Sequence, residues 1–348
     1  MAELTGVDLF AGAGGATQGL KAAGIRVLAA IENDPITAAT YALNHPATKI
    51  HAADIRTVDV RALRMSLGLA RGELTILQAC PPCPSWSSLG VKPENDVREA
   101  LIDDVWRFLR EFRPRAFVLE NVVGLERDPR LARLVRRARG LGYGVRTYRA
   151  DAADFRVPQR RVRLICLGVR GVRSTTFPTE LASPAGTKRP TSSVFKLSSS
   201  LDPQKDPLHL GRRHTATVTR RLEALPAGGT RFDLPSDLTL KCHDDLQSRQ
   251  ATAAYGRMRL NDVAPTLTTR CTTPSCGSFV HPSEPRGITL REAALLQTFP
   301  AAYSFLGTYG EKERQIGNAI PVLMAKAVAG IAVRLVPRAP SPLPEGGL

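Results

Sequence analysis

The chain has 348 residues, of which 43% are hydrophobic and 23% are charged, so a small isolated module and wholesale disorder are both excluded. Its 48 Lys and Arg outnumber its 32 Asp and Glu, and the net charge of +16 favours a polyanionic partner such as nucleic acid. No apolar run approaches the roughly 18 residues that span a bilayer, and no signal-peptide pattern opens the sequence, so we expect no membrane partner.

Short β-rich runs alternate with helical patterns up to about residue 170, which is typical of an α/β protein with a doubly wound parallel sheet. Apolar residues recur at helical spacing in Val97–Phe112 and Pro129–Arg139, which gives each helix one face for the sheet. The predicted strands are Gly6–Phe10, Arg26–Ile31, Leu74–Ala79, Ala116–Glu120, Gly144–Arg149 and Val162–Gly168.

The amino-acid composition changes after about Gly171, where Ser, Thr, Pro and Lys become frequent and the alternation of strand and helix patterns stops. This change indicates a domain boundary. Helical patterns return at Thr289–Phe299 and Pro321–Leu335, whereas the Pro-rich stretch 337–348 is expected to be a flexible tail.

The first predicted strand ends in a turn that contains Gly12, Gly14 and Gly15, and glycines let a backbone approach a ligand closely. Glu32 ends the next strand, where a carboxylate usually binds ribose hydroxyls, and Asp54 could accept a hydrogen bond from an adenine amino group. A dinucleotide and a sulfonium nucleoside both satisfy these features. The glycine spacing departs from G-x-G-x-x-G and favours S-adenosylmethionine, although a turn of this kind also occurs without any cofactor.

Cysteine use points to the reducing cytoplasm, because six Cys in a chain of this length do not make a disulfide scaffold. Cys80 and Cys83 form a C-x-x-C after the predicted strand Leu74–Ala79, but zinc and redox functions are disfavoured because neither a second metal-ligand pair nor a thioredoxin pattern is present. Pro82 and Pro84 constrain the backbone around Cys83, which suits a thiol held at one angle to its target. Cys80 is expected to be a small buried residue.

Six motifs follow one another along the chain. They are Phe-x-Gly-x-Gly-Gly from Phe10, Pro-Pro-Cys ending at Cys83, Glu-Asn-Val from Glu120, Gln-x-Arg-x-Arg from Gln159, Arg-Glu-x-Ala-x-Leu-Gln-x-Phe-Pro from Arg291 and Gln-Ile-Gly-Asn-Ala-Ile-Pro-Val from Gln315. In this order they resemble the C5-cytosine DNA methyltransferase family over most of residues 6–170 and about 255–325. Two positions depart from the family pattern: Pro84 stands where Gln is most common and Ala11 where Ser is frequent.

The resemblance implies a Rossmann-like class I methyltransferase fold with two domains. The catalytic domain, which binds S-adenosylmethionine, would comprise residues 1–172 plus 305–348, because the last motif returns to the cofactor. Residues 173–304 would form a smaller domain, mostly irregular or β, with the target-recognition region at about 173–258.

The chemistry requires a nucleophile, because C5 of cytosine attacks a methyl donor only after a thiol has added to C6. Cys83 is the predicted nucleophile. The resemblance implies that Glu120 holds the N3 and N4 edge of the base, that Arg163 contacts O2, and that Arg161 steadies the surroundings of the nucleophile or binds a phosphate. No side chain is predicted to remove the C5 proton, and a positioned water is expected instead.

The same resemblance assigns the cofactor contacts. Phe10 would lie against the cofactor, Glu32 would bind the ribose, Asp54 the adenine and Asn318 the methionine end, and no metal is expected. The complete set of predicted cofactor-binding residues is Phe10, Ala11, Gly12, Gly14, Gly15, Glu32, Asn33, Asp54, Ile55 and Asn318.

The expected function is methylation of a flipped-out cytosine in a specific double-stranded DNA sequence, either within a restriction-modification system or by a solitary enzyme. A cognate restriction endonuclease could be a partner, but methylation would not require it. We expect the protein to be a cytoplasmic monomer associated with the nucleoid. The main alternative is a tRNA cytosine-5 methyltransferase, which the long basic segment disfavours. A catalytically silent DNA-binding protein and a nicotinamide-dependent oxidoreductase are further alternatives.

Overall fold

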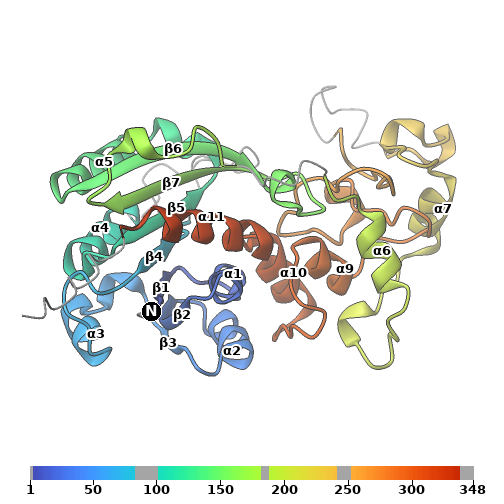
Figure 1. The fold of residues 1–348 in the computed structure, drawn as a ribbon. Helices are drawn as coiled ribbons and strands as arrows, with labels where there is room; N and C mark the ends of the chain where they lie inside the picture. The colour runs from blue at the N-terminus through green and yellow to red at the C-terminus, as the bar shows by residue number, and fades with distance from the viewer. Residues whose placement is uncertain (1–2, 83–100, 182–187, 241–251, 338–348) are drawn as a thin grey trace, which may run out of the picture.

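The computed structural model describes residues 3–82, 101–181, 188–240 and 252–337, and within them one seven-stranded sheet forms the centre of the larger lobe (Figure 1). The order of the strands across the sheet is β3-β2-β1-β4-β5-β7-β6. Their bounds are β1 (Thr5–Leu9), β2 (Arg26–Glu32), β3 (Lys49–Ala52), β4 (Ile76–Ala79), β5 (Ala116–Asn121), β6 (Tyr143–Asp151) and β7 (Val162–Arg170).

The pairing of the strands confirms the predicted doubly wound sheet with one difference. Strands β1 to β5 pair in parallel, whereas β7 runs antiparallel to both β5 and β6. Between β6 and β7 lie only the short 3-10 helix Ala152–Phe155 and a brief loop. Because a parallel pair needs a long crossover, usually a helix, this short connection makes β7 reverse direction.

Helices cover both faces of the sheet, and two separate apolar clusters fill the space beneath them. On one face α4 buries Val105, Phe108, Leu109 and Phe112, the positions that its periodicity predicts. On the other face α11 packs against α1 and β5. The helices around the sheet are α1 (Gly15–Ala22), α2 (Pro35–Asn44), α3 (Val60–Ser66), α4 (Leu101–Phe112), α5 (Pro129–Gly140) and α11 (Val322–Leu335).

The segment Tyr309–Leu335 is long and apolar enough to cross a membrane by length and composition alone. It consists of two helices, α10 (Tyr309–Asn318) and α11, and Pro321 is the N-cap of the second. Met324 and Val328 of α11 are buried in the cluster against the sheet. The apolar helix α11 therefore belongs to the protein core.

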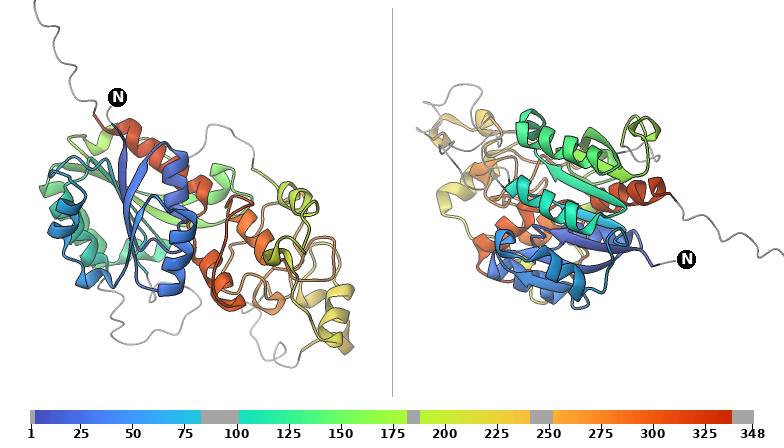
Figure 2. Two further views of the ribbon diagram at one scale, coloured as in Figure 1. Left: turned by 90° about the horizontal axis from the view of Figure 1, so that it is seen from below. Right: turned by 90° about the vertical axis from the view of Figure 1, so that its left-hand side faces the viewer.

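A small lobe lies to one side of the sheet in the left view of Figure 2 and is built mainly from short helices and loops. Within the described part of residues 173–304, β structure is limited to isolated bridges such as Arg257 with Val280, so the irregular character that we expected predominates. The helices of this part are α6 (Ser192–Ser198), α7 (Ala216–Ala224) and α9 (Leu290–Leu296). Aromatic side chains, including Phe279 and Phe299, form its core together with Ala13 of the glycine-rich turn.

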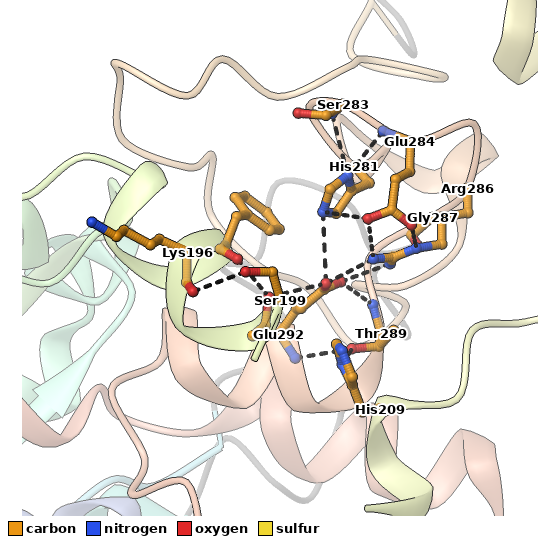
Figure 3. A network of polar contacts seen from close by, with 12 residues as sticks. Lys196, Ser199, His209, His281, Ser283, Glu284, Arg286, Gly287, Thr289 and Glu292 are labelled. Atoms are coloured by element: carbon orange, nitrogen blue, oxygen red, sulfur yellow. Dashed lines mark hydrogen bonds and ion pairs between the residues drawn. The ribbon is translucent and has the colours of Figure 1, made fainter. Parts of the chain in front are cut away.

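A polar network around Glu292 of α9 stabilises the small lobe (Figure 3). Both carboxylate oxygens of Glu292 accept hydrogen bonds from Arg286 across 2.8 Å, and the main-chain N–H of Thr289 donates to Glu292 Oε2. Nδ1 of His281 accepts hydrogen bonds from the main-chain N–H groups of Ser283 and Glu284. Each of these contacts pairs a polar group that would otherwise destabilise the interior.

Candidate active site

A cavity of about 650 Å³ opens at the carboxyl ends of the central strands, between the sheet and α10. It lies where the strand order changes direction, between β1 and β4, which is where ligands bind in open α/β sheets. Among the predicted cofactor-binding residues, those that line it are Phe10, Ala11, Gly12, Gly15, Glu32, Asn33, Asp54, Ile55 and Asn318.

The glycines of the turn after β1 serve two different purposes. Gly12 has φ +54°, and no atom lies within 4 Å of the point where a Cβ would stand. Gly14 does not line the cavity; a Cβ there would come within 2.5 Å of His45 Nε2 and 2.7 Å of the Tyr303 hydroxyl. Gly12 therefore leaves room for a ligand, whereas Gly14 allows the turn to pack against residues behind it.

The carboxylate of Glu32 connects the end of β2 to the glycine-rich turn. Its Oε2 accepts a hydrogen bond from the main-chain N–H of Gly12 and its Oε1 one from that of Asp34, each across 2.9 Å. Burial raises the pKa of Glu32. Because a carboxylate oxygen has two lone pairs, each oxygen of Glu32 can still accept a hydrogen bond from a ligand.

Asp54 lines the same cavity but already has a charged partner. The main-chain N–H and the guanidinium Nε of Arg56 donate to Asp54 Oδ1 across 2.9 and 3.0 Å. These hydrogen bonds lower the pKa of Asp54 to about 2. A ligand amino group would therefore donate to a carboxylate that already accepts hydrogen bonds from Arg56. The sequence did not predict this ion pair.

Glu120, at the end of β5, is the centre of a second group of polar residues on the cavity wall. Its side chain is buried, and Arg163 Nε lies 3.2 Å from Glu120 Oε1. Arg163 is near the start of β7, where Leu164 pairs with Asn121. Because β7 is antiparallel to β5, its beginning lies at the carboxyl edge of the sheet, and this brings Arg163 to Glu120.

Arg161 lines the cavity too, but it is buried and its hydrogen bonds go to the protein. Its Nη1 donates to the main-chain carbonyls of Leu267 and Gly317 across 3.0 and 3.2 Å. These hydrogen bonds join the start of β7 to the small lobe and to the end of α10. Nε of Arg161 is buried without a hydrogen-bond partner among the described residues, so both roles considered for Arg161, steadying the surroundings of the nucleophile and binding a phosphate, stay predictions.

The predicted nucleophile Cys83 lies outside the described residues, which end at Pro82 on this side. The chain leading to it is held by Asn121, whose Nδ2 donates to the carbonyl of Pro81 across 2.7 Å. Cys80 differs from the small buried residue that we expected, because it lines the cavity and its Sγ donates to Glu120 Oε2 across 2.8 Å. The sequence did carry one signal for this position, because Cys80 directly follows the predicted strand Leu74–Ala79, at the edge of the sheet where ligands bind.

Two residues near the site, Tyr303 and His45, escaped the sequence analysis. Tyr303 lies after the Phe-Pro motif of the small lobe and His45 after α2, and neither stands in a motif. The Tyr303 hydroxyl donates to the main-chain carbonyl of Ala13 and lies 2.9 Å from His45 Nε2. No local pattern marks such a contact, because it depends on how distant segments pack.

Comparison with known proteins agrees with this arrangement. The family model of C-5 cytosine-specific DNA methylases matches residues 4–333. The chain is 33% identical to the Type II methylase M.HgiDII of Herpetosiphon aurantiacus over 332 residues, which cover 93% of each protein. It is also 33% identical to the Type II methyltransferase M.XorII of Xanthomonas oryzae pv. oryzae, with 97% of this chain and 87% of that one covered.

Solved structures share the fold at lower identity. A crystal structure described as a DNA modification methyltransferase encoded within a prophage (E. coli) superposes with a TM-score of 0.74 at 22% identity, covering 95% of this chain and 99% of that one. The S. pombe Dnmt2 methyltransferase gives a TM-score of 0.64 at 17% identity, with 95% and 98% covered. With the family model matching nearly the whole chain, this protein belongs to the C-5 cytosine-specific DNA methylase family.

Proposed function

We propose that this protein transfers a methyl group from S-adenosylmethionine to C5 of a cytosine in double-stranded DNA, with Cys83 as the nucleophile. The observation that carries the proposal is that one cavity is lined both by the glycine-rich turn with Glu32 and by Glu120 with Arg163. The first pair suits a nucleoside cofactor, and the second suits a base whose charge changes during the reaction. Methyl transfer requires both ligands to meet in one place.

The residues around the glycine-rich turn fit S-adenosylmethionine. The open space at Gly12 admits a ligand next to the backbone, and the remaining lone pairs of Glu32 suit ribose hydroxyls. Asp54 would accept from the adenine amino group, Phe10 would lie against the cofactor, and Asn318 would reach its methionine end. When bound, S-adenosylmethionine supplies a methyl group on a positively charged sulfur.

The residues on the opposite wall would carry out the chemistry on the base. The Cys83 thiolate forms a bond to C6, which moves electron density onto C5, N3 and O2 of the ring. Glu120 would hydrogen-bond the N3 and N4 edge, and the guanidinium of Arg163 would stabilise the charge at O2. Once C5 carries the methyl group, loss of the C5 proton to a water lets the bond between Cys83 and C6 break.

The substrate that we propose is duplex DNA, from which the target base must be flipped out because its C5 and C6 are stacked between neighbours. The net charge of +16 supports a polyanionic substrate. The relatives that are 33% identical are Type II methylases, which supports a role in restriction and modification. We further propose that residues 173–258 read the DNA sequence, that residues 1–172 plus 305–348 form the catalytic domain, and that the enzyme acts as a cytoplasmic monomer.

The decisive experiment uses methyl-labelled S-adenosylmethionine with duplex DNA, and with tRNA in a parallel reaction. We expect label in 5-methylcytosine of the DNA, none in the tRNA, and none in either with Cys83→Ser. Duplex DNA with 5-fluorocytosine at the target should trap the wild-type protein covalently, because fluorine replaces the proton that must leave. Label in tRNA alone, or labelling of DNA that survives Cys83→Ser, would contradict the proposal.

A further inference from the structure

Cys80 lies at the cavity, and the chemistry proposed above does not use its thiol. Its Sγ donates a hydrogen bond to Glu120 Oε2 across 2.8 Å. Its main-chain N–H donates to the carbonyl of Leu9 in β1 across 3.2 Å, and its side chain packs against the cluster of Ala16 and Ile320. The thiol is therefore held in one place relative to the sheet.

The two carboxylate oxygens of Glu120 have different surroundings. Oε2 accepts the hydrogen bond from Cys80, whereas Oε1 is buried and lies 3.2 Å from Arg163 Nε without a hydrogen-bond partner of good geometry among the described residues. The terminal torsion of a Glu side chain is broad, so a carboxylate needs fixed neighbours to keep its plane. Cys80 fixes one oxygen and thereby leaves Oε1 as the acceptor for a further donor.

The thiol of Cys80 suits a hydrogen-bond donor and not a nucleophile. Burial raises the pKa of Cys80 well above its ordinary value, and the nearby Glu120 carboxylate raises it further. The guanidinium groups of Arg161 and Arg163 oppose this effect but contribute less. A thiolate at this position would face a carboxylate at hydrogen-bond distance, so the proton stays on sulfur.

We propose that Cys80 is a positioning residue for methyl transfer, whose thiol orients the Glu120 carboxylate so that Oε1 meets the N4 amino group of the flipped cytosine. This inference rests on the proposed function, because Cys80 acts through Glu120. It assigns distinct duties to the two thiols of the C-x-x-C: Cys83 bonds to the base, and Cys80 donates to Glu120.

The test compares three substitutions in the full-length protein under single-turnover conditions with saturating DNA and S-adenosylmethionine. Cys80→Ala and the bulkier Cys80→Val remove the donor, and each should slow methyl transfer by about tenfold, the loss expected for one hydrogen bond to a charged group. Cys80→Ser keeps a donor and should stay within about threefold of the wild type. The dissociation constants for DNA and S-adenosylhomocysteine should not change.

Cys166→Ala is the matched control, because Cys166 is a fully buried thiol in β7 that pairs with Leu119 and has no hydrogen bond to Glu120 among the described residues. It should lower the melting temperature and leave the single-turnover rate unchanged. A double-mutant cycle adds a second readout. In a Glu120→Ala background, Cys80→Ala should slow the reaction no further, because the carboxylate through which Cys80 acts is absent.

Several results would overturn the inference. These are a wild-type rate for both Cys80→Ala and Cys80→Val, a Cys80→Ser variant as slow as Cys80→Ala, or additive effects of Cys80→Ala and Glu120→Ala. Loss of the 5-fluorocytosine adduct in Cys80→Ala, with its retention in Cys83→Ser, would instead make Cys80 the nucleophile. A wild-type protein that does not methylate DNA would contradict the proposed function itself, which is a separate result.

Discussion

The hydroxyl of Tyr303 donates a hydrogen bond to the main-chain carbonyl of Ala13 across 2.5 Å, although 290 residues separate them. Because the Tyr303 hydroxyl donates its only proton to the carbonyl of Ala13, it can only accept in its 2.9 Å contact with His45, so His45 Nε2 is the donor there. Burial lowers the pKa of His45 to about 4, so this imidazole stays neutral at physiological pH. The glycine-rich turn is thus held from behind by an aromatic residue that packs in the core of the small lobe.

Replacing Tyr303 with Phe should weaken cofactor binding while leaving the fold intact. The substitution keeps the ring among Phe299 and Phe305 and removes only the hydrogen bonds to Ala13 and His45. We expect the dissociation constant of S-adenosylhomocysteine, measured by calorimetry, to rise about fivefold to tenfold. Tyr309→Phe is the control, since it removes the hydrogen bond from a Tyr hydroxyl to Thr272 instead. Equal affinity in the wild type and Tyr303→Phe would show that the turn keeps its shape without this contact.

Substitutions of Arg163 and Arg160 should affect different quantities, the rate of methyl transfer for Arg163 and the affinity for DNA for Arg160. The Arg163 side chain is 15% exposed and lies beside Glu120, whereas that of Arg160 is 61% exposed with Asp151 as a distant partner at 3.5 Å. Arg163→Ala should reduce the single-turnover rate about 100-fold with little change in DNA affinity. Arg160→Ala should leave that rate unchanged and lower the slope of log K against log salt by about one. The reverse pattern would remove Arg163 from the chemical step.

Asp8 should make stability depend on pH. It is fully buried in β1, accepts a hydrogen bond from Thr17 across 2.7 Å, and burial raises its pKa to about 7. The folded state therefore retains a proton that the unfolded state releases near pH 4, so stability is highest in acid and falls as the pH rises towards 7. Asp8→Asn cannot ionise. As the pH rises from 4 to 8, the free energy of unfolding of Asp8→Asn minus that of the wild type should therefore increase by up to roughly 4 kcal/mol.

Denaturant unfolding of the wild type and Asp8→Asn across this pH range tests the prediction. Taking the difference between the two proteins cancels the other titrating groups, as long as they behave alike in both. A difference in unfolding free energy that does not vary with pH would mean that Asp8 ionises at its ordinary value.

Two glutamates that share Arg286 should differ strongly in their contribution to stability. Glu292 is buried and accepts two hydrogen bonds from Arg286, whereas the side chain of Glu284 is 54% exposed. Glu292→Ala should lower the free energy of unfolding by about 3 kcal/mol, because it leaves the partly buried charge of Arg286 with only the exposed Glu284 as a carboxylate partner. Glu284→Ala, the control, should cost less than about 1 kcal/mol. Similar losses in chemical denaturation would show that the network of Figure 3 is not a buried ion pair in solution.

Local patterns allowed much of the larger lobe to be predicted. The apolar runs of the central strands and the one-sided periodicity of α4 and α5 are local, and these elements lie within a few residues of their predicted bounds. The elements that were not predicted are those with weak patterns. Edge strand β3 is only half buried, and α10 is mostly polar and begins with a capping box of Thr308 and Glu311.

The sequence by itself determined which residue types were available and in what order: glycines after one strand, a carboxylate after the next, two thiols among prolines, and a pair of arginines. The tertiary structure decided which of them meet. Arg163 reaches Glu120 because β7 is antiparallel, Cys80 reaches Glu120 because β4 and β5 are neighbours, and Tyr303 reaches Ala13 because the small lobe packs on the turn. Strand direction and packing depend on contacts between distant segments, and no local pattern of residues encodes them.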